Sequence, residues 1–312
     1  MFRRLGRSLI AVTLALFWLM PGAFAAGEPS ISIVTPKAGD KVTSTDIAVQ
    51  VAVSNFTVDC LHAGLPDKPG VGHIHVMLDG MSMASLTNFY CTNSFTISGQ
   101  GVKPGQHTLM VDLASNTHMD MQPTATEVKF DYEPTSPPAP LPASAKTGAP
   151  TITIAGLNDG AAVGPKFSFT APTTNFTPSG DLEGKQDVAG YGHIHVFVDM
   201  PMMDTSGSSG GMMSMAGMVG MPGTNNISLD LSDWPSGKHT VTVELVQNDH
   251  TPIMDAKAAM VTINLDNPAM PAVAPTALPK TGGNPYALPA ALVVSVLLVG
   301  IGASLRRLRA QR

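Results

Sequence analysis

The chain repeats itself, and this internal repeat limits the fold more than any other feature of the sequence. Corresponding segments are 31–59 and 152–179, GVGHIHV at 70–76 and GYGHIHV at 190–196, GQHT at 105–108 and GKHT at 237–240, and NTH at 116–118 and NDH at 248–250. Because each segment recurs in the same order, the pattern predicts two copies of one fold.

We place the two repeats at 27–134 and 149–268. A Pro/Ala-rich segment, 135–148, separates them, and such a composition predicts an extended, semi-stiff linker. A second Pro-rich spacer, 269–283, separates the second repeat from the C-terminal end.

Apolar and polar residues alternate within each repeat, as they do in 73–79 and 240–246. Period-two segments bounded by glycine and proline are typical of antiparallel strands with one buried face. The chain contains 30 glycines and 26 prolines, and no helical period is present between the two ends. The sequence therefore predicts an all-β protein of two tandem immunoglobulin-like antiparallel β-sandwich domains.

The N-terminal segment 1–26 has the pattern of a signal peptide. Arg3, Arg4 and Arg7 precede a short apolar core, and Ala-Phe-Ala at 23–25 is a small-x-small cleavage site. The apolar core is too short for a transmembrane helix, which needs about 20 residues. We therefore expect export from the cytoplasm.

The C-terminal end has the pattern of a membrane anchor. Residues 287–305 carry no charge and are long enough to span a bilayer as a helix, and the basic tail 306–312 predicts a cytoplasmic end. Just before this span stands the pentapeptide Leu278, Pro279, Lys280, Thr281 and Gly282.

This order of pentapeptide, apolar span and arginine tail resembles the LPxTG sorting signal of bacterial proteins that sortases attach to the cell wall. The resemblance implies a sortase and a cell-wall precursor as partners, with cleavage after Thr281. Without a sortase, the same helix is a single-pass membrane anchor. In both cases the body of the protein lies outside the cell.

The body is acidic and contains no arginine. Residues 27–283 hold 11 lysines and all 23 acidic residues, a net charge of −12. Because nucleic-acid binding needs a positive surface for phosphates, this composition argues against it.

Histidine is the residue type that the repeats share most consistently. Eight of the nine histidines form four matched pairs. The H-x-H motif places two imidazoles on one strand face, and a hairpin brings a third histidine toward them, which suits a transition metal. The predicted ligands are His73, His75 and His118 in the first repeat and His193, His195 and His250 in the second.

Two further pairs have other predicted roles. His107 and His239 open a late strand at the far end of each repeat, and we interpret them as structural. The carboxylates of Asp112 and Glu244 share the outer strand face with the H-x-H motifs and could orient an imidazole. Exposed H-x-H pairs without metal are also common, so this alternative stays open.

Methionine, with 19 copies, makes copper the first choice of metal. The Gly/Ser-rich segment 200–223 contains eight methionines without helical or strand period: Met200, Met202, Met203, Met212, Met213, Met215, Met218 and Met221. Thioethers prefer Cu(I), whereas imidazole also binds Cu(II) and zinc, the second choice. In composition and architecture the chain is similar to Met/His-rich copper proteins of bacterial envelopes. The alternative is that these methionines are pliable apolar filler on a partner-binding surface.

Cys60 and Cys91 predict one disulfide, because an even cysteine count in an exported domain favours pairing. The alternative is a soft-metal site formed by Cys60 with His62.

No catalytic motif accompanies these features, so the sequence predicts a protein that is not an enzyme. The GxGHxH and PxGxHT motifs resemble those of uncharacterised bacterial surface domains, a resemblance that implies no activity. The sequence therefore predicts an exported, surface-anchored metal-binding protein. The alternative is a structural or adhesive display module without metal, which would bind a protein or glycan partner.

Overall fold

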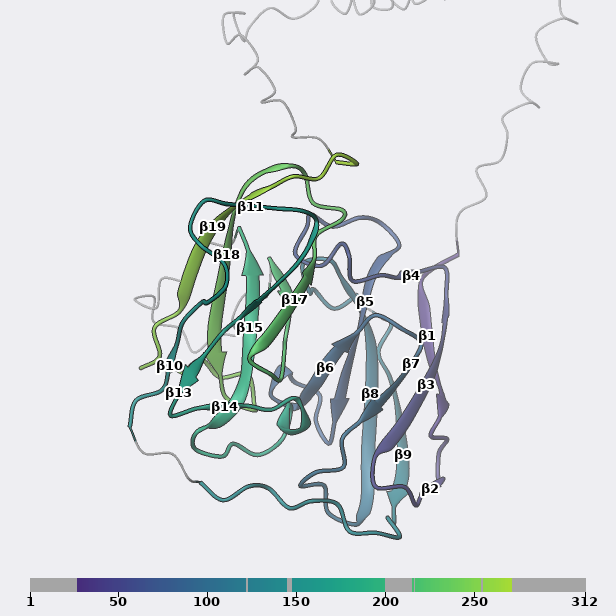
Figure 1. Ribbon diagram of the computed structural model, residues 1–312. Helices are drawn as coiled ribbons and strands as arrows, with labels where there is room; N and C mark the ends of the chain where they lie inside the picture. Colours follow the sequence, from purple (N-terminus) through teal and green to yellow (C-terminus); the bar gives the residue numbers. More distant parts are fainter. Residues whose placement is uncertain are drawn as a thin grey trace, which may run out of the picture. The chain divides into compact units, whose positions relative to one another are not determined.

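The computed structural model of the protein describes residues 27–121, 123–144, 148–199, 215, 217–253 and 255–270 (Figure 1). These residues form strands joined by turns. The only helical elements among them are two short 3-10 helices, η1 (Met83–Ser85) and η2 (Gly180–Leu182). The all-β class predicted from the alternating pattern is confirmed.

The first half of the chain builds two sheets. Its strands are β1 (Ser30–Thr35), β2 (Lys41–Val42), β3 (Ile47–Ser54), β4 (Thr57–Val58), β5 (Val71–Leu78), β6 (Leu86–Tyr90), β7 (Ser94–Ile97), β8 (Gly105–Ser115) and β9 (Thr126–Tyr132). The smaller sheet has the order β1-β3-β7, and the larger has β2-β9-β8-β5-β4 with β6 also paired to β5. Val49 of β3 and Ile74 and Val76 of β5 belong to one buried cluster, because alternate side chains of each strand point to the same core.

The second half repeats this strand order. Its strands are β10 (Thr151–Ile152), β11 (Ala161–Val163), β12 (Lys166–Thr170), β13 (Thr173–Thr174), β14 (Thr177–Pro178), β15 (Tyr191–Val198), β16 (Met218–Gly220), β17 (Asn226–Asp230), β18 (Gly237–Val246) and β19 (Ala259–Leu265). The larger sheet has the order β11-β19-β18-β15-β14, with β16 also paired to β15. The pairs β10-β13 and β12-β17 form the smaller layer.

The strand order matches the immunoglobulin-like sandwich that the sequence predicts. In the first half, β1, β3 and β7 take the places of strands A, B and E, and β5, β8 and β9 take those of C, F and G. The sheets are not purely antiparallel, however. The edge pairs β2-β9, β4-β5, β11-β19 and β14-β15 are parallel. Each involves a strand of two or three residues at the edge of the larger sheet, reached by a crossover from elsewhere rather than by a hairpin.

A third buried cluster joins the two halves, and we call it the inter-repeat core. Its members are Met77, Leu86, Phe89 and Met110 from the first half and Phe197, Met218 and Met221 from the second. Both halves belong to one compact unit. As a result, β5 and β15 are buried on both faces over almost their whole length. The prediction that the H-x-H strands have one exposed face is therefore wrong, because the other half of the chain covers that face.

The described part of the linker lies against the folded halves rather than standing free as a spacer. The Gly101 amide donates to the Ala139 carbonyl at 2.9 Å, and Gln100 Nε2 donates to the Pro140 carbonyl at 3.1 Å. Ser144 Oγ donates to the Ala189 carbonyl of the second half at 3.4 Å.

No helix in the described ranges is long and apolar enough to cross a bilayer. Several predicted features fall outside these ranges: the signal peptide 1–26, the pentapeptide 278–282, the span 287–305, the tail 306–312, and the methionines at 200, 202, 203, 212 and 213. They stay predictions.

Candidate metal centres

The six predicted histidine ligands gather into two groups. The first triad is His73, His75 and His118, and the second triad is His193, His195 and His250. The H-x-H pairs lie on β5 and β15, where alternation sends both imidazoles to the same face. The third histidine of each triad lies in the turn that follows β8 or β18, next to the start of the H-x-H strand.

The second triad has its three nitrogen atoms in a nearly regular triangle. His193 Nε2 lies 3.1 Å from His195 Nε2 and 3.1 Å from His250 Nδ1. The remaining side, from His195 Nε2 to His250 Nδ1, is 3.4 Å. Nitrogens bound to one tetrahedral metal at about 2.0–2.1 Å would lie roughly 3.3 Å apart. The donor atoms therefore fit a metal of this size without rearrangement.

The first triad has the same construction. His73 Nε2 lies 3.1 Å from His75 Nε2, and the ring of His118 lies 4.2 Å from that of His73, centroid to centroid. One ligand atom from each of the three residues lies within 4.8 Å of the others. The triangle is looser than that of the second triad.

Backbone carbonyls fix the tautomer of the third histidine in both triads. His250 Nε2 donates to the Leu86 carbonyl at 2.8 Å, and His118 Nε2 donates to the Met218 carbonyl at 2.9 Å. Because a carbonyl can only accept, each Nε2 carries the proton and each Nδ1 keeps its lone pair. The His118 Nδ1 atom is buried and has no hydrogen-bond partner among the described residues. These two bonds also cross between the halves, since Leu86 belongs to β6 and Met218 to β16.

Burial favours the neutral form of five of the six triad imidazoles, which is the form that binds metals. It is the largest cause of the lowered pKa values of His73, His193, His195 and His250. Burial, followed by the charge of His75, lowers the pKa of His118 to about 3. After burial and His250, the third cause for His195 is the charge of His118, so the two triads influence each other across the inter-repeat core.

The third histidines adopt strained backbone conformations. His118 has a φ of 62° and His250 a φ of 64°, both in the left-handed region. This region costs a residue other than glycine on the order of 1–3 kcal/mol and recurs at functional sites. The matched pairs Asn55 and Asn175, and Asp79 and Asp199, share this conformation, so it belongs to the turns that both halves repeat.

Sequence reasoning missed the carboxylate that contacts the first triad, which belongs to Asp120. Its Oδ1 accepts a hydrogen bond from His75 Nδ1 at 2.9 Å. Asp112, the predicted orienting carboxylate, is paired with His75 in the register but accepts a hydrogen bond from Thr124 Oγ1. Glu244 lies opposite His195 in the register, and no hydrogen bond joins the two side chains within the described ranges. The assignment of Asp112 and Glu244 is therefore corrected to Asp120 alone.

Methionines adjoin both triads through the inter-repeat core. Met77 follows the H-x-H motif on the same face of β5, and Met110 is its partner on β8. Met218 and Met221 are buried there, with Met215 packed against them, and Met218 begins β16. The expectation that no regular structure organises this end of the methionine segment is wrong, because pairing with β15 orders it.

His107 in the first half and His239 in the second form matching sites that differ in kind from the triads. His107 Nδ1 contacts Asp79 Oδ2 at 2.6 Å, and its Nε2 contacts the Lys103 carbonyl at 2.7 Å. His239 makes the matching contacts with Asp199 at 2.6 Å and the Pro235 carbonyl at 2.8 Å. Both ring nitrogens are engaged, so these histidines tie turns to strands, the structural role that the sequence predicts.

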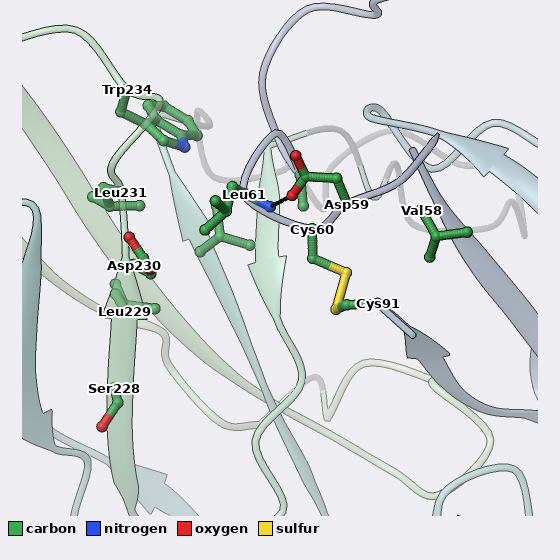
Figure 2. A pocket seen from close by; sticks show the side chains of 12 residues that line it. Val58, Asp59, Cys60, Leu61, Cys91, Ser228, Leu229, Asp230, Leu231 and Trp234 are labelled. Carbon is green, nitrogen blue, oxygen red and sulfur yellow. Dashed lines mark hydrogen bonds between the residues drawn. A yellow bond between two sulfur atoms is a disulfide. The ribbon is translucent and has the colours of Figure 1, made fainter. Parts of the chain in front are cut away.

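Cys60 and Cys91 form a disulfide with Cα atoms 5.3 Å apart, so Cys60 is not a thiolate ligand beside His62. The disulfide lines a pocket of about 310 Å³ together with Leu61, Leu231 and Trp234 (Figure 2). Beside it lies a group that the sequence did not reveal.

This third group consists of Asp59, His62 and Asp233. His62 Nδ1 lies 3.1 Å from Asp59 Oδ2 and 3.4 Å from Asp233 Oδ2. The group is only partly buried, and its imidazole already contacts two carboxylates. It therefore differs from the two triads, because it has one imidazole and two carboxylates and is not fully buried.

Fold and site together define an all-β protein with two buried histidine triads whose donor atoms could hold metal ions. No family model matches the chain, and no curated protein matches it.

Solved structures with similarity to the chain include fibronectin(III)-like modules of Clostridium thermocellum CbhA, at 12% identity over 76% of this chain and 94% of that one, with a TM-score of 0.24. A Dscam structure is similar at 10% identity over 78% of this chain and 47% of that one, with a TM-score of 0.21. The BSP domain structure of a biofilm-associated protein is similar at 11% identity over 78% and 30%, with a TM-score of 0.20. The fold class given above rests on strand order, and these likenesses carry no conclusion about function.

Proposed function

We propose that this protein is an exported, cell-surface-anchored metal-binding protein that captures or handles copper. Each histidine triad holds one ion, and the methionine segment 200–223 receives or passes on Cu(I). The role is binding rather than catalysis.

The observation that carries the proposal is the nitrogen triangle of the second triad, with sides of 3.1, 3.1 and 3.4 Å. Three buried, neutral imidazoles this close together can satisfy the hydrogen bonding of one another's ring nitrogens only in part, because each ring carries a single N–H proton. A metal ion would engage all three lone pairs at once. The matched first triad supports the same interpretation.

Copper is favoured over zinc by what surrounds the triads. Imidazole binds both metals, whereas thioether selects Cu(I). Met77, Met110, Met218 and Met221 lie in the inter-repeat core next to the triads, and the other six methionines of the segment 200–223 precede Met218 in the sequence. Zinc at the triads is the second choice.

The surface location rests on the pattern of the two ends. A signal peptide at 1–26 would export the chain, and the segment 278–312 would attach it to the wall through sortase or hold it in the membrane through the 287–305 helix. The arginine-free, acidic body suits cations and disfavours nucleic acid.

The test is the metal stoichiometry of the purified chain, titrated with Cu(I), Cu(II) and Zn(II). We expect two copper ions at the triads of each chain, and one in each of the double variants His73→Asn with His75→Asn and His193→Asn with His195→Asn, counted apart from any Cu(I) on the methionine segment. His62→Asn is the control, since it removes a histidine outside both triads and should leave two ions. Binding no tighter than that of surface histidines would overturn the proposal.

The second candidate function is a structural or adhesive display module without metal. The observation in its favour is that two triad histidines donate hydrogen bonds across the halves, from His118 to Met218 and from His250 to Leu86. On this alternative, the double variants would unfold the chain, and the parent chain would bind no metal. The ligand of such a module would be a protein or glycan partner.

A further inference from the structure

The two triads differ in the group that contacts their H-x-H imidazoles. In the first triad, His75 Nδ1 donates to Asp120 Oδ1 at 2.9 Å. In the second, the Nδ1 atoms of His193 and His195 are both buried, and neither has a hydrogen-bond partner among the described residues. Within the described ranges, a carboxylate thus contacts an H-x-H imidazole in the first triad and none does in the second.

The difference arises from a single matched position. Asp120 forms an isolated β-bridge with Ala114, and Pro252 forms the corresponding bridge with Val246. Ala114 lies opposite His73 in the strand register, just as Val246 lies opposite His193. Proline therefore stands in the second half where aspartate stands in the first.

The other acidic side chains near the triads do not remove this asymmetry. Asp67 accepts from the Thr117 amide, and its counterpart Asp187 accepts from the Asp249 amide, so these two occur in both halves. Asp249 itself, beside His250, accepts from the Thr251 amide instead of an imidazole.

The strand positions opposite the H-x-H imidazoles also carry an acid in both halves. Asp112, opposite His75, accepts from Thr124 Oγ1. Glu244, opposite His195, has no hydrogen bond to that ring among the described residues. Among the acidic residues that the structure describes, Asp120 alone forms a hydrogen bond with an imidazole of either triad.

The charge of a bound ion decides what such a contact does. The cost of placing an ion in a buried site grows with the square of its charge, so a divalent ion needs compensation far more than a monovalent one. A carboxylate that accepts a hydrogen bond from a ligating imidazole makes the ligand more basic and offsets part of the positive charge. A buried site of three neutral imidazoles without such a contact discriminates against divalent ions.

We propose that the two triads bind different charge states: the first holds a divalent ion, Cu(II) or Zn(II), and the second holds monovalent Cu(I). Asp120 is the positioning residue that sets this preference through His75. The inference rests on the proposed function, since it requires that both triads bind metal.

The experiment uses the full chain with two probes that do not change oxidation state, Zn(II) for the divalent ion and Ag(I) for Cu(I). We expect one tightly bound Zn(II) and two Ag(I) at the triads, counted apart from any Ag(I) that the methionine segment 200–223 takes up. Asp120→Asn should lower the Zn(II) affinity by about 10–100-fold and leave the Ag(I) affinity nearly unchanged. Asp120→Glu should restore Zn(II) binding, and the control Glu133→Gln, at an exposed acid that pairs with Lys41, should alter neither.

A double variant, His73→Asn with His75→Asn, isolates the second triad and does not depend on how Asp120 variants fold. It should keep one Ag(I) and lose tight Zn(II) binding. The inference is overturned if this variant binds Zn(II) as tightly as the parent chain, or if Asp120→Asn weakens both probes equally. Binding of neither probe by the parent chain would instead overturn the proposed function.

Discussion

At the scale of the residue, Glu183 has the least favourable surroundings of any acid in the described part of the chain. Its side chain follows η2, is 1% exposed, and neither carboxylate oxygen has a hydrogen-bond partner among the described residues. Burial, followed by the charge of Asp181, raises its pKa well above the usual range. Ala63 stands at the corresponding position of the first half, so the fold does not need an acid there.

We expect Glu183→Gln to stabilise the protein at pH 7.5 by about 1–3 kcal/mol, because it removes the penalty of ionising a buried acid. The folded pKa is raised, so the penalty grows as pH rises above the unfolded pKa and vanishes below it. Urea unfolding at pH 7.5 and pH 4.5 checks this: the gain should be present at the higher pH and absent at the lower. Glu133→Gln is the control, since Glu133 forms an exposed ion pair with Lys41 and should have little effect. An equal gain at both pH values would contradict the explanation.

At the scale of the element, close approach between a loop and a strand edge positions the second triad. Gly184 has a φ of 71°, and a methyl group on its Cα would lie 2.7 Å from the Leu86 carbonyl oxygen. That oxygen is the acceptor for His250 Nε2. Glycine is therefore required here for both its conformation and its size.

Gly184→Ala should push the loop away from β6 and weaken metal binding by the second triad, while the first triad is unaffected. The matched control is Gly160→Ala, where φ is 76° but nothing lies within 4 Å of the added methyl group. The control should lose about 1 kcal/mol of stability from backbone strain alone and bind metal normally. Stoichiometry and thermal unfolding, measured on both variants, separate the two effects. Equal metal binding by both variants would show that the Leu86 contact does not position His250.

The methionine segment supplies a second prediction at this scale. Deleting residues 203–214 leaves Met218 and Met221 of the inter-repeat core in place. We expect the deletion to weaken Cu(I) binding and to leave Cu(II) binding nearly unchanged, because thioethers prefer the softer ion. Competitive titration with each ion measures the difference, and an equal loss of both would contradict the division.

The local sequence pattern was enough to predict much of the arrangement of the triad histidines. The alternation of β5 predicts that His73 and His75 share a face, and the antiparallel pairing with β8 predicts that His118 returns to it. Alternation does not say what covers a face, so the burial of the triads was not predictable from it. The apolar residues Met77 and Phe197 on the supposedly exposed face were the available signal.

Asp120 was missed for a related reason. It lies beyond a turn in which His118 adopts left-handed φ, and this reversal follows no strand or helix period. Asp112 was chosen because it shares a regular strand face with His75, whereas its carboxylate is held by Thr124. Side-chain contacts that depend on irregular backbone are not encoded in periodicity.

At the scale of the whole molecule, the triads are also part of the packing between the halves, so protons should act on stability through them. Burial lowers the pKa of five triad histidines: His73, His118, His193, His195 and His250. The unfolded chain binds protons at these groups near pH 6.5, whereas the folded chain does so only at lower pH. Their contribution to stability is therefore complete above pH 6.5 and is lost as the pH falls below it.

His107 and His239 act in the opposite direction. Hydrogen bonds from Asp79 and Asp199 raise their pKa values, so their contribution is present below the unfolded pKa and is lost as the pH rises through the folded pKa. The two sets act in different pH ranges, because His107 and His239 affect stability above the unfolded pKa and the five triad histidines below it. Below pH 6.5 the triad histidines therefore determine the sign among the histidines, and stability falls on acidification.

The measurement is urea unfolding of the metal-free chain, with a chelator present, at pH 7.5 and pH 5.5. We expect lower stability at pH 5.5, and a smaller decrease in the double variant His73→Asn with His75→Asn, which lacks the buried imidazole of His73. A saturating metal that binds only the folded chain should raise stability at pH 7.5, and protons should displace it at pH 5.5, so the pH dependence should steepen when metal is present. Equal stability of the metal-free chain at both pH values would mean that the triad histidines are not buried as neutral imidazoles between the two halves.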